Sequence, residues 1–424
     1  METKTNKDRQ VRALIAVLML SVIFNSVATV RSLEGSLQTE VRGISKYVSN
    51  PIEVGPSNLV IISNPYEGVD WNTFSQFKTA LHVHTFHSDG INSMYEMIMR
   101  HYNLGFHVIA ITDHDVLTYR WDEAPIDTWG GRLELVSTNL KDMIYAGDIE
   151  RLYSNTPYGM ISIPHSNERS RCGHHHVTLW ANSINNWNNL EESFKELDGI
   201  SGVWFLAHPG RYTGGMVGGI EGVERSKDSN IVEEYVRWML NHESLLGIEI
   251  HNRLDNETRS DRILWDQILM KTMPKGRNVF GFSNDDSHSL AGVGFNWNVV
   301  LAPILHESYL RYAITSGAFY AVTRFDRQLG INYFEQGLRV GDLERILQQN
   351  TPSLTRVEVG NDIIIIKAQN YERIEWVADG QVIHVGAYLD IREKLEVIDS
   401  YVRVQIISST GVAMLQPFGI LPKI

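Results

Sequence analysis

Leu-His-Val-His-Thr-Phe-His-Ser-Asp-Gly, residues 81–90, follows directly on a short apolar strand that we predict for residues 78–82. Side chains two residues apart on a strand point to the same side, so His82 and His84 can bind one metal ion together. The pair His-x-His is common by chance. Here the pair is followed by Ser88-Asp89-Gly90 and, further on, by Ile-Thr-Asp-His-Asp at 111–115, so it does not stand alone.

The same unit recurs from residue 78 to about 320: an apolar strand, a polar cluster at its end, and usually an amphipathic helix, as at 93–104 and 260–271. Strands alternating with helices predict a largely parallel sheet, and polar residues at the carboxyl ends of its strands predict a barrel-type α/β enzyme. The further polar clusters, after strands predicted at residues 106–112, 203–207, 246–250 and 278–283, are Asp113-His114-Asp115, His208-Pro209-Gly210, His251-Asn252 and Asp285-Asp286-Ser287-His288.

Histidine is distributed very unevenly in this chain. None of the sixteen histidines precedes His82, and only His306 and His384 follow His288. Solubility gives no reason for such segregation, whereas a metal site does. The single cysteine, Cys172, excludes an intramolecular disulfide and a thiolate zinc finger.

The N-terminus carries the pattern of an export signal. A basic start at residues 1–12 precedes the apolar run 13–24 and the small residues Ser26-Val27-Ala28. A run of this length predicts a cleaved signal peptide over residues 1–28, and a secreted, periplasmic or cell-envelope location. Counting residues 11–30 brings the run near the roughly 20 residues of a membrane span, so an uncleaved anchor stays open as the one route to membrane contact.

The rest of the chain divides by composition. Residues 29–77 form a polar leader, 78–320 the catalytic barrel, and 321–424 a region of short β-rich segments separated by turns. That last region predicts a small all-β, sandwich-like domain, almost without plausible metal ligands.

Charge limits the partners. The 424 residues carry a net charge of −12, which argues against nucleic acid or an anionic membrane as the main partner. A small phosphorylated substrate is compatible with this charge, because bound cations reverse the local field.

Four motifs together resemble those of the PHP family (polymerase and histidinol phosphatase): residues 81–90, Ile-Thr-Asp-His-Asp at 111–115, Ala-His-Pro at 207–209 and Asp-Ser-His at 286–288. The β-rich tail resembles the CehA/McbA-type metallohydrolase branch. The resemblance implies a distorted (β/α)7 barrel with two or three divalent metals, often Zn, Mn or Fe, at the carboxyl ends of its strands.

The resemblance also implies roles for individual residues. Nine side chains would hold the metals: His82, His84 and Asp286 the first, His176 and His208 the second, Asp89, His114 and His288 the third, with Glu168 bridging the first two.

Two of these assignments leave alternatives. The sequence before Glu168, residues 164–167, lacks the glycine that the family has there. In the triplet 174–176, the strand-like residues that follow favour His176, with His175 as the alternative. The Asp-x-His spacing favours Asp286 over Asp285.

The ligand set predicts hydrolysis. Cations close together lower the pKa of a shared water toward neutrality, from about 15.7 in bulk, and the hydroxide can attack phosphorus. Asp113 and Asp115 are expected to orient ligands or carry protons. Arg211, just after His-Pro-Gly, is expected to meet a substrate phosphate. Nucleophile-elbow and phosphate-loop patterns do not occur.

The sequence therefore predicts an exported metal-dependent phosphoesterase that acts on a small phosphate mono- or diester. Two alternatives stay open. One is a metallohydrolase of a carboxylic or carbamate ester or an amide, since the same hydroxide can attack carbon. The other is a non-catalytic envelope-binding protein that keeps its metals for structure.

Overall fold

The computed structural model describes residues 59–118, 159–183, 189–213, 225–255, 259–332 and 342–422. The predicted signal peptide or anchor at 1–28 and the leader up to residue 58 lie outside these residues. In the part of the chain that is described, no helix is both long and apolar enough to cross a membrane.

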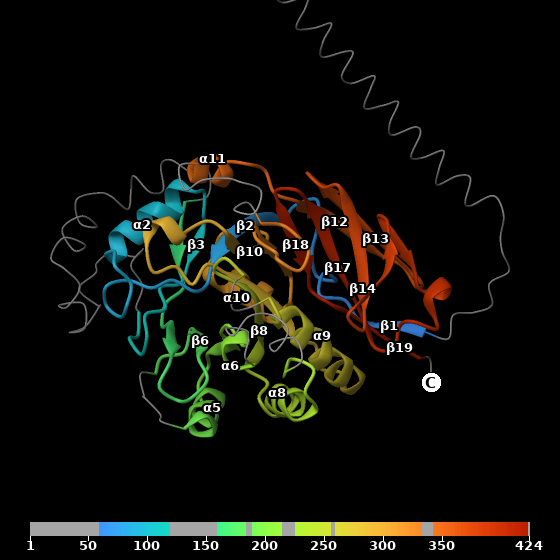
Figure 1. Ribbon diagram of the computed structural model, residues 1–424, viewed down its shortest axis with the longest axis horizontal. Coiled ribbons are helices and arrows are strands. Elements are labelled where there is room, and N and C mark those ends of the chain that lie inside the picture. Colours follow the sequence, from blue (N-terminus) through green and yellow to red (C-terminus); the bar gives the residue numbers. More distant parts are fainter. Residues whose placement is uncertain are drawn as a thin grey trace, which may run out of the picture. The chain divides into compact units, whose positions relative to one another are not determined.

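The described chain is a mixed α/β structure (Figure 1). Its α-helices are α2 (Met94–Asn103), α5 (Leu190–Asp198), α6 (Gly210–Thr213), α8 (Ser229–Asn241), α9 (Asp261–Thr272), α10 (Glu307–Ser316) and α11 (Leu343–Leu347). Short 3-10 helices are η5 (Met273–Lys275), η6 (Leu290–Gly292) and η8 (Ile391–Lys394).

A five-stranded sheet lies in the middle of the sequence and has the order β5-β6-β7-β8-β9. Its strands β7, β8 and β9 are parallel, whereas β5, β6 and β7 pair antiparallel. The strands are β5 (Asn167–Arg169), β6 (His176–Leu179), β7 (Val203–Leu206), β8 (Leu245–Asn252) and β9 (Phe280–Asn284).

The second sheet joins the two ends of the described chain. Its main path is β1-β19-β17-β18-β11-β10-β2-β3-β4, and β14 links β15 to β17. The strands are β1 (Leu59–Ser63), β2 (Ser75–Ala80), β3 (Val108–Ile109), β4 (Ile161–Ser162), β10 (Asn296–Ala302), β11 (Phe319–Thr323), β14 (Arg373–Ala378), β15 (Gln381–Val385), β17 (Tyr401–Ser408), β18 (Gly411–Leu415) and β19 (Phe418–Pro422).

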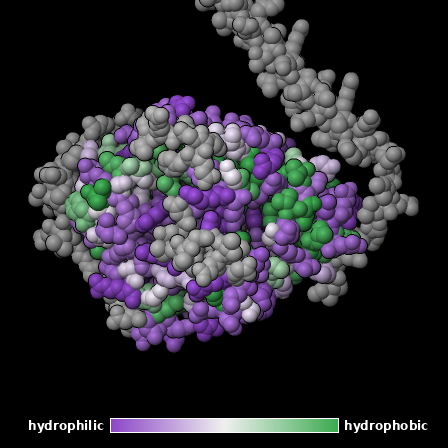
Figure 2. All heavy atoms as spheres, viewed as in Figure 1, coloured by the Kyte–Doolittle hydropathy of each residue, from purple (hydrophilic) through white to green (hydrophobic). Residues whose placement is uncertain are grey.

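A third sheet of three strands, β12 (Ser353–Val359), β13 (Ile363–Gln369) and β16 (Tyr388–Asp390), completes the β-rich tail. On the face drawn in Figure 2, hydrophobic residues gather over these tail strands, while most of the remaining visible surface is hydrophilic. Val382, Val385 and Tyr388 of the tail are among the exposed large hydrophobic residues.

The described strands do not form one continuous barrel. Two isolated parallel bridges connect the first two sheets instead, between Val83 and Ser287 and between His114 and Glu168. All four residues follow or lie in the strands that carry the polar clusters. The mixed α/β class is as predicted, while the closed (β/α)7 barrel is not seen as such among these strands.

The tail is not separate from the catalytic region. Strand β18 pairs with β11, which pairs with β10, and the predicted boundary at 320/321 falls inside β11. One hydrophobic core contains both Ile98 of α2 and Leu415 of β18. Composition changes near residue 320, but a strand edge left open there would expose unpaired backbone groups. The tail strands cover that edge, so the predicted independent sandwich is only partly evident.

Helix α2 illustrates how the local sequence fixes an element near the polar clusters. Ser93 and Glu96 form a capping box that satisfies the free N–H groups of the first turn. Met94, Met97 and Ile98 lie on its buried face. Each of these side chains contributes roughly 1.5–3 kcal/mol by burial. The helix thereby anchors the C-terminal end of the loop that carries Asp89.

Candidate metal centre

Glu168 lies at the centre of the site and is fully buried. Its Oε2 lies 3.1 Å from His82 Nε2, 3.2 Å from His84 Nε2 and 3.0 Å from His114 Nδ1. Its Oε1 lies 2.9 Å from His175 Nδ1 and 3.0 Å from His208 Nε2. The two oxygens thus face two different sets of imidazoles, which is the arrangement of a carboxylate that bridges two ions.

His82 is held in one orientation from behind. Its Nδ1 lies 2.8 Å from Oε1 of Glu249, a buried carboxylate of β8 that can only accept. The proton of this ring must therefore be on Nδ1, which leaves the Nε2 lone pair directed at Glu168 and Asp286. The other oxygen of Glu249 accepts from the backbone N–H of His208 at 2.8 Å, so one carboxylate positions two candidate ligands.

Asp286 completes the first group. Its Oδ1 lies 3.4 Å from His82 Nε2 and 3.1 Å from His84 Nε2, and Asp286 is 4% exposed. Four donors, from His82, His84, Glu168 and Asp286, converge here within 4.8 Å of one another. Ligands bound tetrahedrally at about 2.1 Å from one ion lie about 3.4 Å apart, close to the spacings observed.

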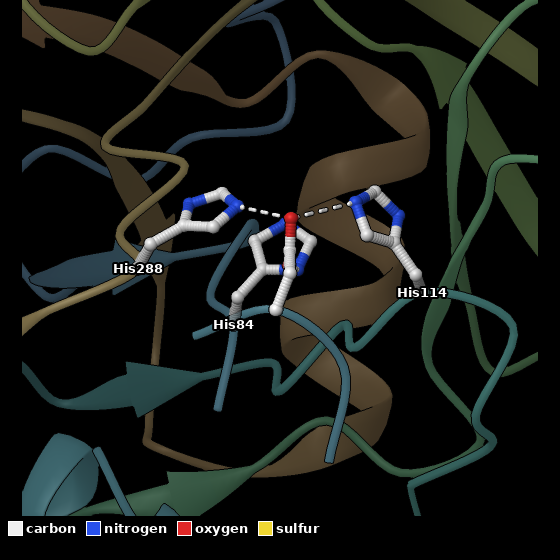
Figure 3. Close-up of side chains that lie close together, drawn as sticks. His84, His114 and His288 are labelled. Atoms are coloured by element: carbon white, nitrogen blue, oxygen red, sulfur yellow. Dashed lines mark hydrogen bonds and ion pairs between the residues drawn. The ribbon is translucent and has the colours of Figure 1, made fainter. Parts of the chain in front are cut away.

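A more open group lies beside the first. His288 Nε2 is 3.1 Å and His114 Nε2 3.5 Å from Oδ2 of Asp89, whose side chain is 55% exposed. Figure 3 shows His84, His114 and His288 arranged around one carboxylate oxygen. His288 Nδ1 lies 2.8 Å from the carbonyl oxygen of Asp286, so this nitrogen donates and Nε2 keeps its lone pair. This group could hold a further ion near solvent.

Several ligand atoms at the centre of the site lack hydrogen bonds. Five of them are buried without a hydrogen-bond partner: His82 Nε2, His84 Nε2, His114 Nδ1, Glu168 Oε2 and Asp286 Oδ1. Leaving a buried polar atom unsatisfied costs about 1–3 kcal/mol, and five at one point would be a large penalty. Divalent metal ions remove that penalty, because nitrogen and carboxylate oxygen are their ordinary ligands. The residues present therefore fit the metals that the sequence predicts.

The electrostatics of the group agree with this. Burial alone would raise the pKa of Glu168, but the charge of His82 and contacts from His114, His175 and His208 hold it well below its usual range. Burial alone would lower the pKa of His84, but the Asp286 and Glu168 carboxylates raise it to about 9. The site attracts positive charge strongly, whether protons or metal ions.

The structure corrects the assignment of His176. His176 points away from Glu168, with Nε2 3.0 Å from Ser193 Oγ and Nδ1 3.0 Å from the carbonyl oxygen of His174. Burial lowers its pKa to about 3. Strand β6 begins at His176, and neighbouring residues there face opposite sides, so His175 faces the cluster instead. His175, the alternative from the sequence, joins His114 and Glu168 in a third group of potential ligands.

Asp113 and Asp115 support loops and do not join the groups of potential ligands. Asp113 accepts from Thr85 N and Oγ1 and from Ser88 Oγ, at 2.6–2.7 Å, and so fixes the loop between His84 and Asp89. Asp115 accepts from Ser170 N and Oγ, at 3.1 and 2.8 Å, beyond the end of β5. Both positions fit the orienting role expected from the sequence.

Arg211 lies in α6 with its side chain exposed. No hydrogen bond or ion pair joins its side chain to the cluster residues in the described ranges. The structure therefore gives no support to the expected contact between Arg211 and a substrate phosphate.

Two residues of the site were not foreseen. Glu249 orients His82 and also accepts from Asn252 and Asn284 at 2.8 Å. Arg253, one residue beyond β8, donates from Nε to Asp286 Oδ2 at 3.0 Å. The signal for Glu249 was a carboxylate inside the apolar run of β8, where an unpaired charge would be costly.

Asp285 and Asp286 have separate functions. Asp285 accepts from the backbone N–H groups of Gly294, Phe295 and Asn296 at 2.6–3.0 Å. It thereby ties the loop after β9 to the start of β10, and Asp286 alone reaches the cluster. This placement agrees with the choice that the Asp-x-His spacing favoured.

The backbone around the site is strained. His208, Arg253 and Asp286 have φ of 31°, 49° and 45°, in a region that residues other than glycine seldom adopt. Such conformations cost roughly 1–3 kcal/mol each and cluster at functional sites. The three residues follow β7, β8 and β9, where the chain must turn its side chains toward one point.

Comparisons with known proteins add a fold-level likeness. No family model matches the sequence, and no curated protein matches it. A two-domain protein from Bacteroides vulgatus ATCC 8482, described as containing a predicted PHP-like metal-dependent phosphoesterase, is 14% identical over 86% of this chain and 90% of that chain, with a TM-score of 0.41. The lesion-specific endonuclease EndoQ from Pyrococcus furiosus is 11% identical over 57% and 56%, with a TM-score of 0.31. Neither likeness assigns a function to this chain.

Proposed function

We propose that this protein is a metal-dependent hydrolase of the PHP type that cleaves small phosphate mono- or diesters with two or three divalent ions. One observation carries the proposal: five imidazoles surround the buried carboxylate of Glu168, and five of the ligand atoms that converge there have no hydrogen-bond partner. A structural zinc site is closed by four protein ligands. Here the ligands come from the ends of many strands, as in a catalytic centre.

Each of the three groups of potential ligands would hold one ion. His82, His84, Glu168 and Asp286 would hold one ion, and Glu168 with His114 and His175 would hold a second, next to His208. Asp89, His84, His114 and His288 would hold a third. Ions bound there supply charge stabilisation for a phosphoryl group and lower the pKa of water.

The chain's own residues prepare the site for this chemistry. Glu249 keeps the proton of His82 on Nδ1, and the Asp286 carbonyl keeps that of His288 on Nδ1. Asp113 fixes the loop that leads to Asp89. The half-exposed Asp89 marks the side from which a substrate enters, because the first group is buried.

The proposal that the protein is of the PHP type includes a barrel fold. Strands β2, β3 and β4 are parallel neighbours, β5–β9 follow in chain order, and the bridges of Val83 with Ser287 and His114 with Glu168 connect the two sets. This order supports a distorted (β/α)7 ring whose seams are narrow. The CehA/McbA-type branch rests on the sequence resemblance of the tail alone.

The deciding experiment combines metal analysis with turnover. Protein lacking residues 1–28 is expected to hold two to three equivalents of Zn, Mn or Fe and to hydrolyse phosphate esters in a chelator-sensitive way. Paired phosphate and carboxylate esters of one chromogenic alcohol separate the phosphoesterase from the carbon-ester hydrolase. Bound metal without turnover of either ester would support the binding protein, and absence of metal would refute the site.

Export and substrate range belong to the same proposal. The basic start and apolar run of the first 28 residues support a signal peptide, and N-terminal sequencing of the mature protein would reveal cleavage after Ala28. The net charge of −12 supports small substrates over nucleic acid. Measurable turnover of DNA at physiological salt would contradict that preference.

A further inference from the structure

Two apolar side chains are exposed on the loop that carries Asp89. Phe86 is 41% exposed and Ile91 77% exposed, which makes Ile91 the most exposed large hydrophobic residue in the ranges that the structure describes. The four residues between them are His, Ser, Asp and Gly. A single exposed hydrophobic residue is ordinary on a protein surface, whereas a pair that flanks a candidate metal ligand indicates a surface that binds something apolar.

Hydrogen bonds hold this loop, residues 85–92, in a tight turn. The carbonyl oxygen of Thr85 accepts from the N–H groups of Ser88 and Gly90 at 3.1 and 3.0 Å. A Cβ atom at Gly90 would lie 2.8 Å from the backbone nitrogen of Thr85, so only glycine fits where the chain turns back. The exposed side chains therefore project from a backbone of fixed shape.

The two apolar residues are close to each other across the neck of the turn. The N–H of Phe86 donates to the carbonyl oxygen of Asn92 at 2.9 Å. Ile91 precedes Asn92 directly, and consecutive Cα atoms are about 3.8 Å apart, so the backbones of Phe86 and Ile91 are near neighbours. They form one small apolar surface, which we call the apolar rim.

The apolar rim lies next to the open group of potential metal ligands. The N–H of Ile91 donates to the carbonyl oxygen of His288 at 2.8 Å, and His288 Nε2 lies 3.1 Å from Asp89 Oδ2. His288 and Asp89 belong to the group that contains the three histidines of Figure 3. The side chain of Asp89 is 55% exposed, so Ile91 borders the side of the centre that is open to solvent.

We propose that Phe86 and Ile91 contact the alcohol part of the substrate, and that the protein prefers phosphate esters of apolar alcohols. The inference rests on the proposed function and names its leaving group. The phosphoryl group binds at the metals, and the ester substituent must extend toward solvent past Asp89, because the first ligand group is buried. An alkyl or aryl substituent there removes water from both apolar side chains, whereas a polyhydroxy alcohol gains little from them.

The experiment measures kcat/KM of the metal-loaded protein for methyl, propyl and hexyl phosphate and for glycerol phosphate. The value should rise about twofold for each added methylene, half the free energy of full burial, so hexyl phosphate should exceed methyl phosphate about thirtyfold. Glycerol phosphate has the chain length of propyl phosphate but should be the poorer substrate, because its alcohol is polar. A wild type that cleaves the methyl and hexyl esters equally well overturns the inference.

Phe86→Ser and Ile91→Ser should each lower the hexyl-to-methyl ratio at least about threefold, and the double variant should lower it further. Both side chains are exposed, so the variants should fold. Metal content and inhibition by inorganic phosphate should stay at the wild-type level, because neither depends on the ester substituent. An unchanged ratio in the double variant overturns the role of the apolar rim.

Ile304→Ser serves as the matched control. Ile304 is 55% exposed and follows the end of β10 at Ala302, whereas the first residue of β10, Asn296, binds Asp285 beside the centre. Its hexyl-to-methyl ratio should equal that of the wild type, and a fall as large as in Ile91→Ser would remove the assignment to the rim. A metal-loaded wild type that hydrolyses none of these phosphate esters overturns the proposed function itself.

Discussion

Two of the buried clusters of charged groups among the described residues are satisfied in opposite ways. Around Arg262, Asp255 accepts two hydrogen bonds at 3.0 and 2.8 Å, and the backbone carbonyl of Ile250 accepts a third at 2.8 Å. Asp326 lies 3.3 Å from the same guanidinium and 3.0 Å from His251. Around Glu168, by contrast, carboxylates meet the ring nitrogens His82 Nε2, His84 Nε2 and His114 Nδ1, which have no hydrogen-bond partner.

The difference separates structural charge from functional charge. The Arg262 cluster contains its own cation, so each carboxylate is compensated within the chain. The Glu168 cluster has carboxylates and imidazole lone pairs but needs cations from outside. Residue type alone does not separate them, because His251 and Asp326 are also buried metal-ligand types. The presence of a cationic partner within the cluster does separate them. It assigns metal binding to the Glu168 cluster and a stabilising role to the Arg262 cluster.

The largest expected effect tests the Glu168 cluster. Glu168→Gln removes the shared charge of two ligand groups, so turnover should fall about 10³-fold or more, with loss of bound metal. Elemental analysis and ester hydrolysis measure both.

A matched pair of variants serves as its control. His175→Gln should also lose metal, whereas His176→Gln, which removes the adjacent imidazole on the other side of β6, should retain it. The opposite result for the pair would contradict the assignment of His175 as the residue that faces the cluster.

The second effect tests the Arg262 cluster. Arg262→Met leaves Asp255 and Asp326 buried without a cation and should lower the free energy of unfolding by about 3–5 kcal/mol. Urea denaturation of the metal-loaded protein measures this, and the folded fraction should keep its full metal content. Arg237→Met, at an exposed ion pair, should change stability by less than about 1 kcal/mol. Loss of metal in folded Arg262→Met would erase the distinction between the clusters.

A smaller effect, on metal affinity, is expected from a substitution of Glu249. Glu249 binds no ion in our assignment but orients His82 and His208. Glu249→Gln should weaken metal affinity about 10–100-fold, the range for outer partners of ligands, without loss of folding. Competition with a metal indicator measures this. An unchanged affinity would leave Glu249 with a structural role only.

The smallest expected effect is the pH dependence that Asp326 gives to the free energy of unfolding. Burial would raise the pKa of Asp326, but Arg262 and His251 lower it from 3.8 to about 2. A carboxylate with a depressed folded pKa contributes stability that is complete above pH 3.8 and is lost as the pH falls through about 2. The contribution is about 2 kcal/mol. Wild type and Asp326→Asn, unfolded in urea across this pH window, should differ in slope, and identical slopes would contradict the pairing.

Much of the site follows from sequence because its ligands occupy strand ends. Strands β7, β8 and β9 lie near their predicted positions and are parallel, so His208 after β7 and Asp286 after β9 come to the same edge of the five-stranded sheet. His175 could not be separated from His176, since one residue in the start of β6 reverses which side each faces. Glu249 was overlooked because its hydrogen-bond partner, His82, is 167 residues away in the sequence.

The pairing of the tail strands with the preceding region could not be predicted from local sequence patterns, because it also depends on residues far apart in the chain. The β-rich character of the tail was predicted, but the pairing of β18 with β11 depends on edges that only the folded chain defines. A change of composition near residue 320 indicated a boundary, whereas the hydrogen bonds cross it.

The place of β18 and Gln416 has a consequence for the order in which the protein matures. Gln416 binds both the N–H and the carbonyl of Gly281 in β9, the strand that leads to Asp286. Strand β11 pairs with β10 and acquires its second neighbour, β18, only from residues beyond 410. Because Gln416 follows every predicted ligand in the chain, β9 obtains these two hydrogen bonds only after all the ligands from His82 to His288 have been synthesised.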